Sequence, residues 1–427
     1  MNFEEAMRRT FPEKADELLR LAGEAPTQGF FINRKKGSAE EILSLCDFPR
    51  KEYPYSTDLF YHDCANIGKT KAFELGLIYS QEPSAGMPVT LIDPDVSLAI
   101  DLCAAPGGKS CGLLSRISPE ARLIANDVNY SRAQILSSNL ERLGFSNAAV
   151  TSLPTVKIAE KLEGKADLVI VDAPCSGEGM VRKYPEIREE YNENNIRLNA
   201  ERQKAVLEDA YRCLMPGGQL LYSTCTFAEE EDEQQVLGLM SRHPDMRLVT
   251  LDRPDLPVKD GMIKLTFLEG SEGQFMALLR KDGVKTKQVL PGKRCVKEKL
   301  IDDFLQKETD LKEYCLYREK DRYFLSLQEE YEYGLPCLRY GIDLGELKKG
   351  RYEPSHAFYR ANALKGRYRN SYSLNEEEYY QFIQGLEIDC PLQGYTAVDY
   401  RGFALGFGKA SGGKLKNKYP KGLRRVV

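Results

Sequence analysis

The sequence predicts an α/β protein whose central region holds a mostly parallel sheet with one antiparallel end strand, flanked by α+β modules on both sides. Three observations lead to this fold class. Between about residues 96 and 282, apolar runs of strand length alternate with helical patterns, which is typical of a parallel sheet covered on both faces. Two apolar stretches then flank the turn-like segment "LEGSEGQ". The regions before and after are richer in tyrosine and lack this alternation.

The central region is expected to contain strands and helices in regular order. The strands are predicted at residues 96–102, 121–127, 147–152, 166–173 and 218–225. The helices are predicted at residues 108–116, 130–143, 155–163, 199–214 and 229–242. The stretches "GMIKLTF" and "QFMALLRK" predict a closing hairpin, which supplies the antiparallel strand at the end of the sheet.

The chain of 427 residues is too long for one typical core, so several domains are expected. The predicted divisions are 1–88, 89–282 and 283–427. In the first, "QGFFINRK" and "LGLIYS" are strand-like, and an amphipathic helix is expected to begin near Phe11. A lysine-rich joint at residues 282–299 opens the last part.

Composition limits the class of protein. The charged N-terminus is unlike a signal peptide and no apolar run reaches the roughly 20 residues that span a bilayer, so we expect a cytoplasmic protein without membrane contact. The 11 cysteines are odd in number and irregular in spacing, which favours reduced thiols over disulfides. The three histidines are scattered and no Cys-x-x-Cys pair occurs, so we expect no metal site. We also expect a monomer.

Positive charge gathers near the C-terminus, although the formal net charge is −4. Residues 348–369 carry seven Lys/Arg against one acid, and residues 408–427 carry seven and no acid. With Tyr, Phe and Gly between the charges, such clusters indicate a polyanion partner and favour nucleic acid. A merely solvated basic tail is the alternative.

The stretch "DLCAAPGGKS", residues 101–110, follows a predicted strand and opens a predicted helix. It departs from a phosphate-binding P-loop because Cys103 replaces the first glycine and Pro106 removes an amide from the phosphate cradle. Such a loop can still hold a small carboxylate through its free N–H groups. Asp127 ends the next strand, where an acid accepts ribose hydroxyls. The pair fits S-adenosylmethionine, while a solvated Asp127 stays an alternative.

Two cysteines are predicted to meet beside this loop. "VDAPCSGEGM" places Cys175 just beyond the fourth strand, and "LYSTCTFAEEEDEQQV" places Cys225 just beyond the fifth. Because ligands bind at the carboxyl edge of such sheets, both thiols are expected beside the cofactor. One strand-end cysteine is more often core, but two at one edge favour nucleophilic chemistry. No histidine is nearby in sequence, so activation would come from local dipoles or a lysine such as Lys183.

In order and spacing, "DLCAAPGGKS", "DAPCSGEG" and "STCT" resemble the RNA cytosine-5 methyltransferases of the Sun/Fmu type, over nearly the whole chain. "YSQEPSA" looks like the family's segment before the catalytic core, and "LKNKYPKGLRR" resembles the bacterial RsmF-like 16S rRNA branch with its PUA-like C-terminal module. The resemblance implies a class I, Rossmann-like methyltransferase core and S-adenosyl-L-methionine as cofactor. It implies methylation of cytosine carbon 5 in RNA, with small-subunit rRNA expected first and tRNA second.

The resemblance also implies roles for individual residues. Cys225 would be the nucleophile that attacks carbon 6 of cytosine, Cys175 the assisting thiol, and Asp172 the acid between cofactor and base. The residues implied to hold the cofactor are Cys103, Ala104, Ala105, Pro106, Gly107, Gly108, Lys109, Asp127 and Asp172. The family often places an acid near the adenine after the third strand. Pro154 stands there in this chain, so that contact would come from backbone or from Ser152.

RNA affinity is expected from the two flanking regions, residues 1–88 and 283–427. The residues predicted to contact RNA are Lys183, Lys414, Lys416, Lys418, Lys421, Arg424 and Arg425. Two other functions stay open, a P-loop nucleotide-dependent protein and an RNA-binding scaffold without catalysis. Stabilisation by ATP would favour the first, and absence of S-adenosylmethionine binding would favour the second.

Overall fold

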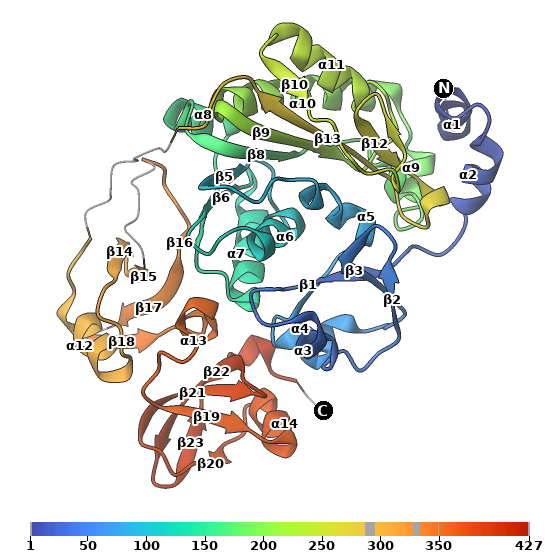
Figure 1. Ribbon diagram of the computed structural model, residues 1–427. Coiled ribbons are helices and arrows are strands. Elements are labelled where there is room, and N and C mark those ends of the chain that lie inside the picture. Colours follow the sequence, from blue (N-terminus) through green and yellow to red (C-terminus); the bar gives the residue numbers. More distant parts are fainter. Residues whose placement is uncertain (1, 287–294, 328–333, 349, 426–427) are drawn as a thin grey trace.

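The computed structural model describes residues 2–286, 295–327, 334–348 and 350–425 (Figure 1). Its largest element is a ten-stranded sheet. The parallel strands are β5 (Leu98–Asp101), β6 (Arg122–Asn126), β7 (Ala148–Thr151), β8 (Ala166–Asp172) and β9 (Leu214–Thr224). The antiparallel strands are β10 (Met246–Leu248), β11 (Val258–Lys259), β12 (Met262–Leu265), β13 (Gln274–Lys281) and β16 (Arg339–Tyr340).

The strand order is β11-β12-β13-β9-β8-β5-β6-β7-β16, with β10 paired to β13. The predicted parallel centre and the closing hairpin are confirmed. The sheet is more mixed than expected, because antiparallel strands stand at both ends rather than at one. At the far edge, β16 from the C-terminal region pairs with β7, a contact between segments nearly 190 residues apart that no local pattern announces.

Helices cover both faces of this sheet, as predicted. They are α6 (Gly108–Arg116), α7 (Tyr130–Leu143), α8 (Thr155–Leu162), α10 (Glu193–Cys213) and α11 (Glu233–Arg242). Alternate residues of each strand pack on opposite sides: Ala99 joins α6 and α7, whereas Leu98 and Ile100 join the helices of the other face. This two-sided burial explains the continuous apolar runs in the sequence. No helix in the described ranges is long and apolar enough to cross a membrane.

The N-terminal region begins with two short helices, α1 (Phe3–Thr10) and α2 (Ala15–Leu21). The expected helix start near Phe11 is therefore wrong. A capping box explains the earlier start, because the Asn2 side chain accepts from the Glu5 N–H and the Glu5 carboxylate accepts from the Asn2 N–H. A four-stranded antiparallel sheet follows, with the order β2 (Arg50–Tyr53), β3 (Ser56–His62), β1 (Gly29–Ile32), β4 (Ile78–Ser80). Short helices α3 (Ala39–Leu43) and α4 (Lys71–Glu74) lie between its strands, and α5 (Pro83–Gly86) follows β4.

The C-terminal region contains two further sheets. The first has the order β14 (Cys315–Glu319), β15 (Arg322–Ser326), β17 (Ile342–Lys348), β18 (Arg351–Pro354). The second has the order β19 (Ser371–Leu374), β21 (Gly394–Tyr400), β22 (Phe403–Ser411), β23 (Lys414–Asn417), β20 (Ile388–Asp389). Their helices are α12 (Lys299–Glu308), α13 (His356–Arg360) and α14 (Glu376–Gln384). Part of the expected lysine-rich joint, residues 287–294, lies outside the described residues, as do residues 349, 426 and 427 of the two basic stretches.

The N-terminal sheet and the last sheet share one hydrophobic core, although they stand at opposite ends of the chain. Buried Glu74 of α4 lies in this interface. Its carboxylate accepts the hydroxyls of Tyr419 at 2.6 Å and Tyr379 at 2.7 Å, and the Arg425 guanidinium lies 3.2 Å away. Arg425, which was expected to contact RNA, is thus tied to the N-terminal region.

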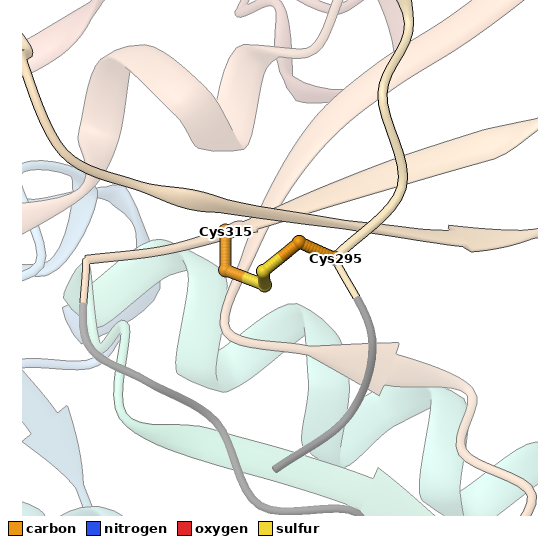
Figure 2. Close-up of a disulfide and its surroundings, with 2 residues drawn as sticks. All are labelled: Cys295 and Cys315. Atoms are coloured by element: carbon orange, nitrogen blue, oxygen red, sulfur yellow. A yellow bond between two sulfur atoms is a disulfide. The ribbon is translucent and has the colours of Figure 1, made fainter.

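A disulfide joins Cys295 to Cys315 at the start of β14 (Figure 2). The expectation of reduced thiols is therefore wrong for this pair, while the other nine cysteines are free. Val296 N–H donates to Leu316 O at 2.9 Å, so the chain leaving Cys295 runs beside β14. The Cα atoms of the two cysteines come within 5.2 Å, a separation that a disulfide spans. An odd cysteine count argues against a full disulfide framework but does not exclude a single pair.

Candidate active site

A cavity of about 770 Å³ opens where β5, β8 and β9 end. The residues predicted from sequence that line it are Cys103, Ala104, Ala105, Pro106, Gly108, Lys109, Asp172, Cys175, Lys183 and Cys225. Of the residues predicted to hold the cofactor, Gly107 and Asp127 do not line it. Within the part of the chain that the structure describes, no group of three or more His, Cys, Asp or Glu side chains could hold a metal ion.

The loop after β5 ends in two glycines, which form a cradle at the start of α6. Gly107 adopts φ +115°, a left-handed conformation that glycine accepts readily, and α6 begins at the next residue. A Cβ on Gly108 would lie 2.6 Å from Gln81 Nε2, so a larger residue would fill this space. Beneath the loop, buried Asp101 accepts from Ser110 Oγ at 2.7 Å through Oδ2, while its Oδ1 has no hydrogen-bond partner among the described residues. Burial raises the pKa of Asp101 to about 7.

Asp127 lies behind an arginine that the sequence reasoning did not single out. Its Oδ1 accepts from Asn129 N–H at 2.9 Å, and its Oδ2 is 3.4 Å from Arg132 Nη1. Arg132 also donates to Ala105 O at 2.6 Å and lines the cavity, whereas Asp127 is buried. The arginine thus covers the acid and joins it to the cofactor loop. Its position on the first turns of α7, just after the acid, is a signal that could have identified it.

The two cysteines that follow β8 and β9 are neighbours. Cys175 Sγ and Cys225 Sγ are 3.4 Å apart, within hydrogen-bond distance for sulfur. The pKa of Cys175 is raised well above its ordinary value, first by this hydrogen bond and then by burial. Cys175 is therefore a neutral thiol at pH 7, and a neutral thiol can donate a hydrogen bond to the sulfur of Cys225.

Direct contacts tie the loops that carry the two thiols. Ser176 Oγ and Thr226 Oγ1 are 2.6 Å apart, and Gly179 N–H donates to Cys225 O at 3.0 Å. Gly179 also passes so close to Gly273 that an added Cβ would lie 2.4 Å from the Gly273 Cα. Only a residue without a side chain fits here, which explains a glycine on each loop. The backbones of three loops are therefore packed directly behind the thiols.

Glu231 fixes the Cys175 loop from below. Ser176 N–H donates to Glu231 Oε2 at 3.0 Å and to Oε1 at 3.2 Å. Gln203 of α10 donates to the same carboxylate at 2.8 Å and to Pro174 O at 2.9 Å. Burial raises the pKa of Glu231 to about 7. Sequence reasoning gave neither residue a role: Glu231 lies in the acidic run of the quoted stretch after Cys225, and Gln203 lies outside every motif.

Asp172 connects the segment after β5 to the end of β9, which precedes Cys225. Its Oδ1 accepts from Lys109 Nζ at 2.8 Å and from Ser223 Oγ at 2.9 Å. Lys109 is buried, so this ion pair fixes the carboxylate at the end of β8. In a P-loop the equivalent lysine must reach phosphates. Here it is bound to Asp172, which weighs against the ATP alternative.

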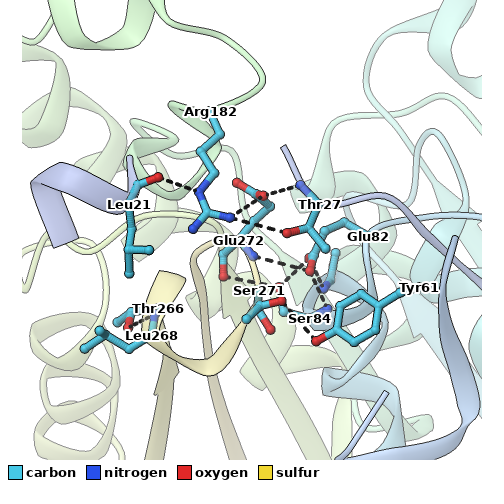
Figure 3. Close-up of polar contacts among 12 residues, drawn as sticks. Leu21, Thr27, Tyr61, Glu82, Ser84, Arg182, Thr266, Leu268, Ser271 and Glu272 are labelled. Atoms are coloured by element: carbon cyan, nitrogen blue, oxygen red, sulfur yellow. Dashed lines mark hydrogen bonds and ion pairs between the residues drawn. The ribbon is translucent and has the colours of Figure 1, made fainter. Parts of the chain in front are cut away.

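The N-terminal region and the β12–β13 turn line one side of the cavity. Figure 3 shows the polar contacts that join them. Arg182 donates to Leu21 O at 3.1 Å and lies 3.5 Å from Glu272 Oε1, which also accepts from Thr27 N–H at 2.8 Å. Glu272 N–H in turn donates to Glu82 Oε1 at 3.3 Å. Three distant segments meet in this network, and sequence reasoning did not assign them to the site. Burial raises the pKa of Glu82 and of Glu272.

The residues expected to contact RNA or adenine lie in different places. Lys183 is exposed at the cavity, with its ammonium 5.3 Å from the Tyr184 ring centroid. None of the six tail residues lines the cavity. Within that group Lys414 is paired with Asp389 at 2.6 Å, while Lys416, Lys418 and Lys421 are exposed on or after β23. Ser152 donates to Val128 O at 3.2 Å, and neither it nor Pro154 lines the cavity.

Four family models match this chain. They are described as 16S rRNA methyltransferase RsmB/F (residues 89–280), the RsmF N-terminal domain (1–83), the first C-terminal domain of RsmF (302–361) and the RsmF PUA domain (369–425). Together they cover all but short segments of the chain.

Similar proteins support the same assignment. The ribosomal RNA small subunit methyltransferase F of Aliivibrio salmonicida is 30% identical over 92% of this chain and 90% of its own length. The ribosomal RNA small subunit methyltransferase F of Enterobacter sp. is 28% identical over 92% of this chain and 89% of its own length. Among solved structures, a methyltransferase homolog from Pyrococcus horikoshii is 26% identical, with a TM-score of 0.58 over 65% of this chain and 93% of that chain. With its thiol pair, glycine cradle and flanking domains, this chain belongs to the RsmB/F family of 16S rRNA methyltransferases.

Proposed function

We propose that this protein transfers a methyl group from S-adenosylmethionine to carbon 5 of a cytosine in 16S rRNA, through a covalent bond between Cys225 and the base. The observation that carries this proposal is the pair of thiols 3.4 Å apart in a cavity that also contains the glycine cradle. The names of the relatives support rRNA as the substrate. A ribosomal substrate implies the cytoplasm, and we propose that the protein acts on it as a monomer.

The residues present fit the cofactor. The cradle at residues 103–109 and the first turn of α6 offer N–H groups to its carboxylate. The unpartnered Oδ1 of Asp101 is suited to its ammonium group, and Asp127 to its ribose once Arg132 moves aside. When bound, S-adenosylmethionine supplies an electrophilic methyl group. The chain supplies the alignment of the base with that methyl.

Cys225 is proposed as the nucleophile. Only a few per cent of an ordinary thiol is ionised at neutral pH, but that thiolate is intrinsically very reactive. Its attack on carbon 6 forms a C–S bond and moves the ring electrons toward carbon 5, which is otherwise too electron-poor to accept a methyl group. No described residue hydrogen-bonds Oδ2 of Asp172, so this oxygen is available to the ring nitrogen 3 edge of the cytosine.

Release of the product reverses the first bond. The carbon-5 proton leaves to a base, its electrons restore the ring double bond, and the C–S bond breaks with its electron pair on Cys225. Cys175 supports this step, because its raised pKa keeps a proton on the thiol that faces the departing sulfur. The flipped base must be unstacked to reach the thiols, which favours a loop or a remodelled helix in the RNA. The flanking regions, 1–88 and 283–427, would hold the RNA.

The two thiols can be separated by experiment. Cys225→Ser is expected to abolish both methylation and any protein–RNA adduct, because a hydroxyl is a far poorer nucleophile. Cys175→Ser is expected to form the bond and transfer the methyl, and then to accumulate as an adduct that survives boiling in denaturant. Gel electrophoresis with labelled 16S rRNA distinguishes the two. Exchanged behaviour would reverse the roles, and normal turnover by both variants would refute the thiol mechanism.

A further inference from the structure

A second groove shares Cys175 with the active-site cavity. It has a volume of about 320 Å³ and is lined by Cys175, Ser176 and residues between 187 and 202. Because Cys175 lines both hollows, the groove begins beside the active site. We propose that the groove binds a nucleotide that flanks the target cytosine in single-stranded RNA. This inference rests on the proposed function.

One face of α10 forms a wall of the groove. Asn195, Asn199 and Arg202 follow at spacings of four and three residues, which aligns them on one side of the helix. The next residue, Gln203, is fully buried and donates to Pro174 O at 2.9 Å. The hydrogen bonds of Gln203 thus hold α10 against the Cys175 loop. The polar face therefore keeps a fixed position relative to the thiol.

The polar groups of this face are available to a ligand. Across the described ranges, the side chains of Asn195, Asn199 and Arg202 make one hydrogen bond, from Arg202 Nη1 to Asn199 Oδ1 at 3.5 Å. No carboxylate in those ranges pairs with Arg202. Many other cations of the molecule are committed to partners, such as Lys109 to Asp172. Apart from this one long hydrogen bond, the guanidinium and the two amides keep donors and acceptors that a polar ligand can use.

The chemistry of these groups suits a nucleotide. An amide side chain carries two donors and an acceptor, so Asn195 and Asn199 can recognise the edge of an unstacked base. The guanidinium of Arg202 can bind a phosphate with two parallel hydrogen bonds. Leu198, 44% exposed between them, offers an apolar surface to the base. A cytosine that is flipped toward Cys225 leaves its neighbours unstacked and within one nucleotide of the groove.

The test uses the full chain and 16S rRNA transcripts, free and assembled into small subunits. Bisulfite sequencing maps the methylated cytosine, and the bases on its two sides are then changed one at a time. Initial rates of methyl transfer are compared for Asn195→Ala, Asn199→Ala and Arg202→Gln. The matched control is Arg197→Ala, which removes an exposed arginine from the opposite side of the same helix.

The wild-type protein is expected to methylate RNA with one particular base at one flanking position faster than RNA with the other bases, by on the order of tenfold. The two asparagine variants should lose that preference, whereas Arg202→Gln should weaken binding of every RNA equally and reduce the salt slope by about one. Arg197→Ala should keep both properties. A wild type without preference, or asparagine variants that retain it, would overturn the inference. If wild type binds S-adenosylmethionine but methylates no RNA, the proposed function itself has failed.

Discussion

Replacement of Glu231 by glutamine tests whether the support beneath Cys175 matters for release of the product. The carboxylate accepts from Ser176 N–H and from Gln203, which also donates to Pro174 O. Glutamine keeps the shape but replaces one accepting oxygen with an NH₂ that can only donate. One buried donor then faces another, at a cost of about 1–3 kcal/mol. A shift of the loop that relieves this contact would move Cys175.

The expected result is a longer-lived adduct. Because Glu231 does not touch the reacting atoms, Cys225 should still attack and the methyl should still transfer in the first turnover. Release should slow by on the order of tenfold, which corresponds to an activation barrier higher by about 1.4 kcal/mol. Single-turnover methylation and adduct decay, followed on denaturing gels, measure the two steps separately. The control is Glu229→Gln, an exposed neighbour.

The pH dependence of stability gives an independent signature. Burial raises the pKa of Glu231 from 4.5 to about 7 in the folded state, so the folded state binds more protons between these values. The stability that Glu231 contributes is therefore full below about pH 4.5 and is lost as pH rises through 7, by up to about 3 kcal/mol. Denaturant unfolding should show that Glu231→Gln lowers the free energy of unfolding more at pH 5 than at pH 8. The reasoning would be refuted if the adduct of Glu231→Gln decayed at the wild-type rate and if the loss of unfolding free energy in this variant were the same at both pH values.

Three further outcomes are expected. Asp127→Ala should weaken S-adenosylmethionine binding by roughly 1–3 kcal/mol, the cost of losing a charged hydrogen-bond partner; unchanged affinity in calorimetry would place the ribose elsewhere. Neutralising the exposed lysines of the tail, Lys416, Lys418 and Lys421, should flatten the salt dependence of RNA binding and leave cofactor binding intact; an unchanged slope would make the tail a solvated surface. Glu74→Gln should destabilise the protein by about 1–3 kcal/mol in denaturant unfolding, because it weakens the interface between the first and last sheets; equal stability would show that this carboxylate is dispensable.

The sequence by itself predicted the parts of the site that depend on regular topology. Strands of a parallel sheet end at one edge, so motifs at successive strand ends must meet there whatever the side chains between them. This is why Cys175 and Cys225 could be placed together from their positions alone, and the 3.4 Å separation of their sulfurs agrees with that reasoning. The position of the loop after β5 in the same cavity followed from the same rule. Helix and strand order followed from apolar periodicity, which records burial on both faces of the sheet.

Only the tertiary structure revealed which distant residues complete the site. Thr27 and Glu272 are 245 positions apart, and no local pattern announces their hydrogen bond. The support of Cys175 by Glu231 depends on how Gln203 of α10 packs against the Cys175 loop. The spacing of residues in the sequence does not predict such packing. Arg425 looked like an RNA contact by charge, yet a buried acid in the first region binds it. Charge and periodicity describe what a residue can do, whereas the neighbours that folding brings decide what it does.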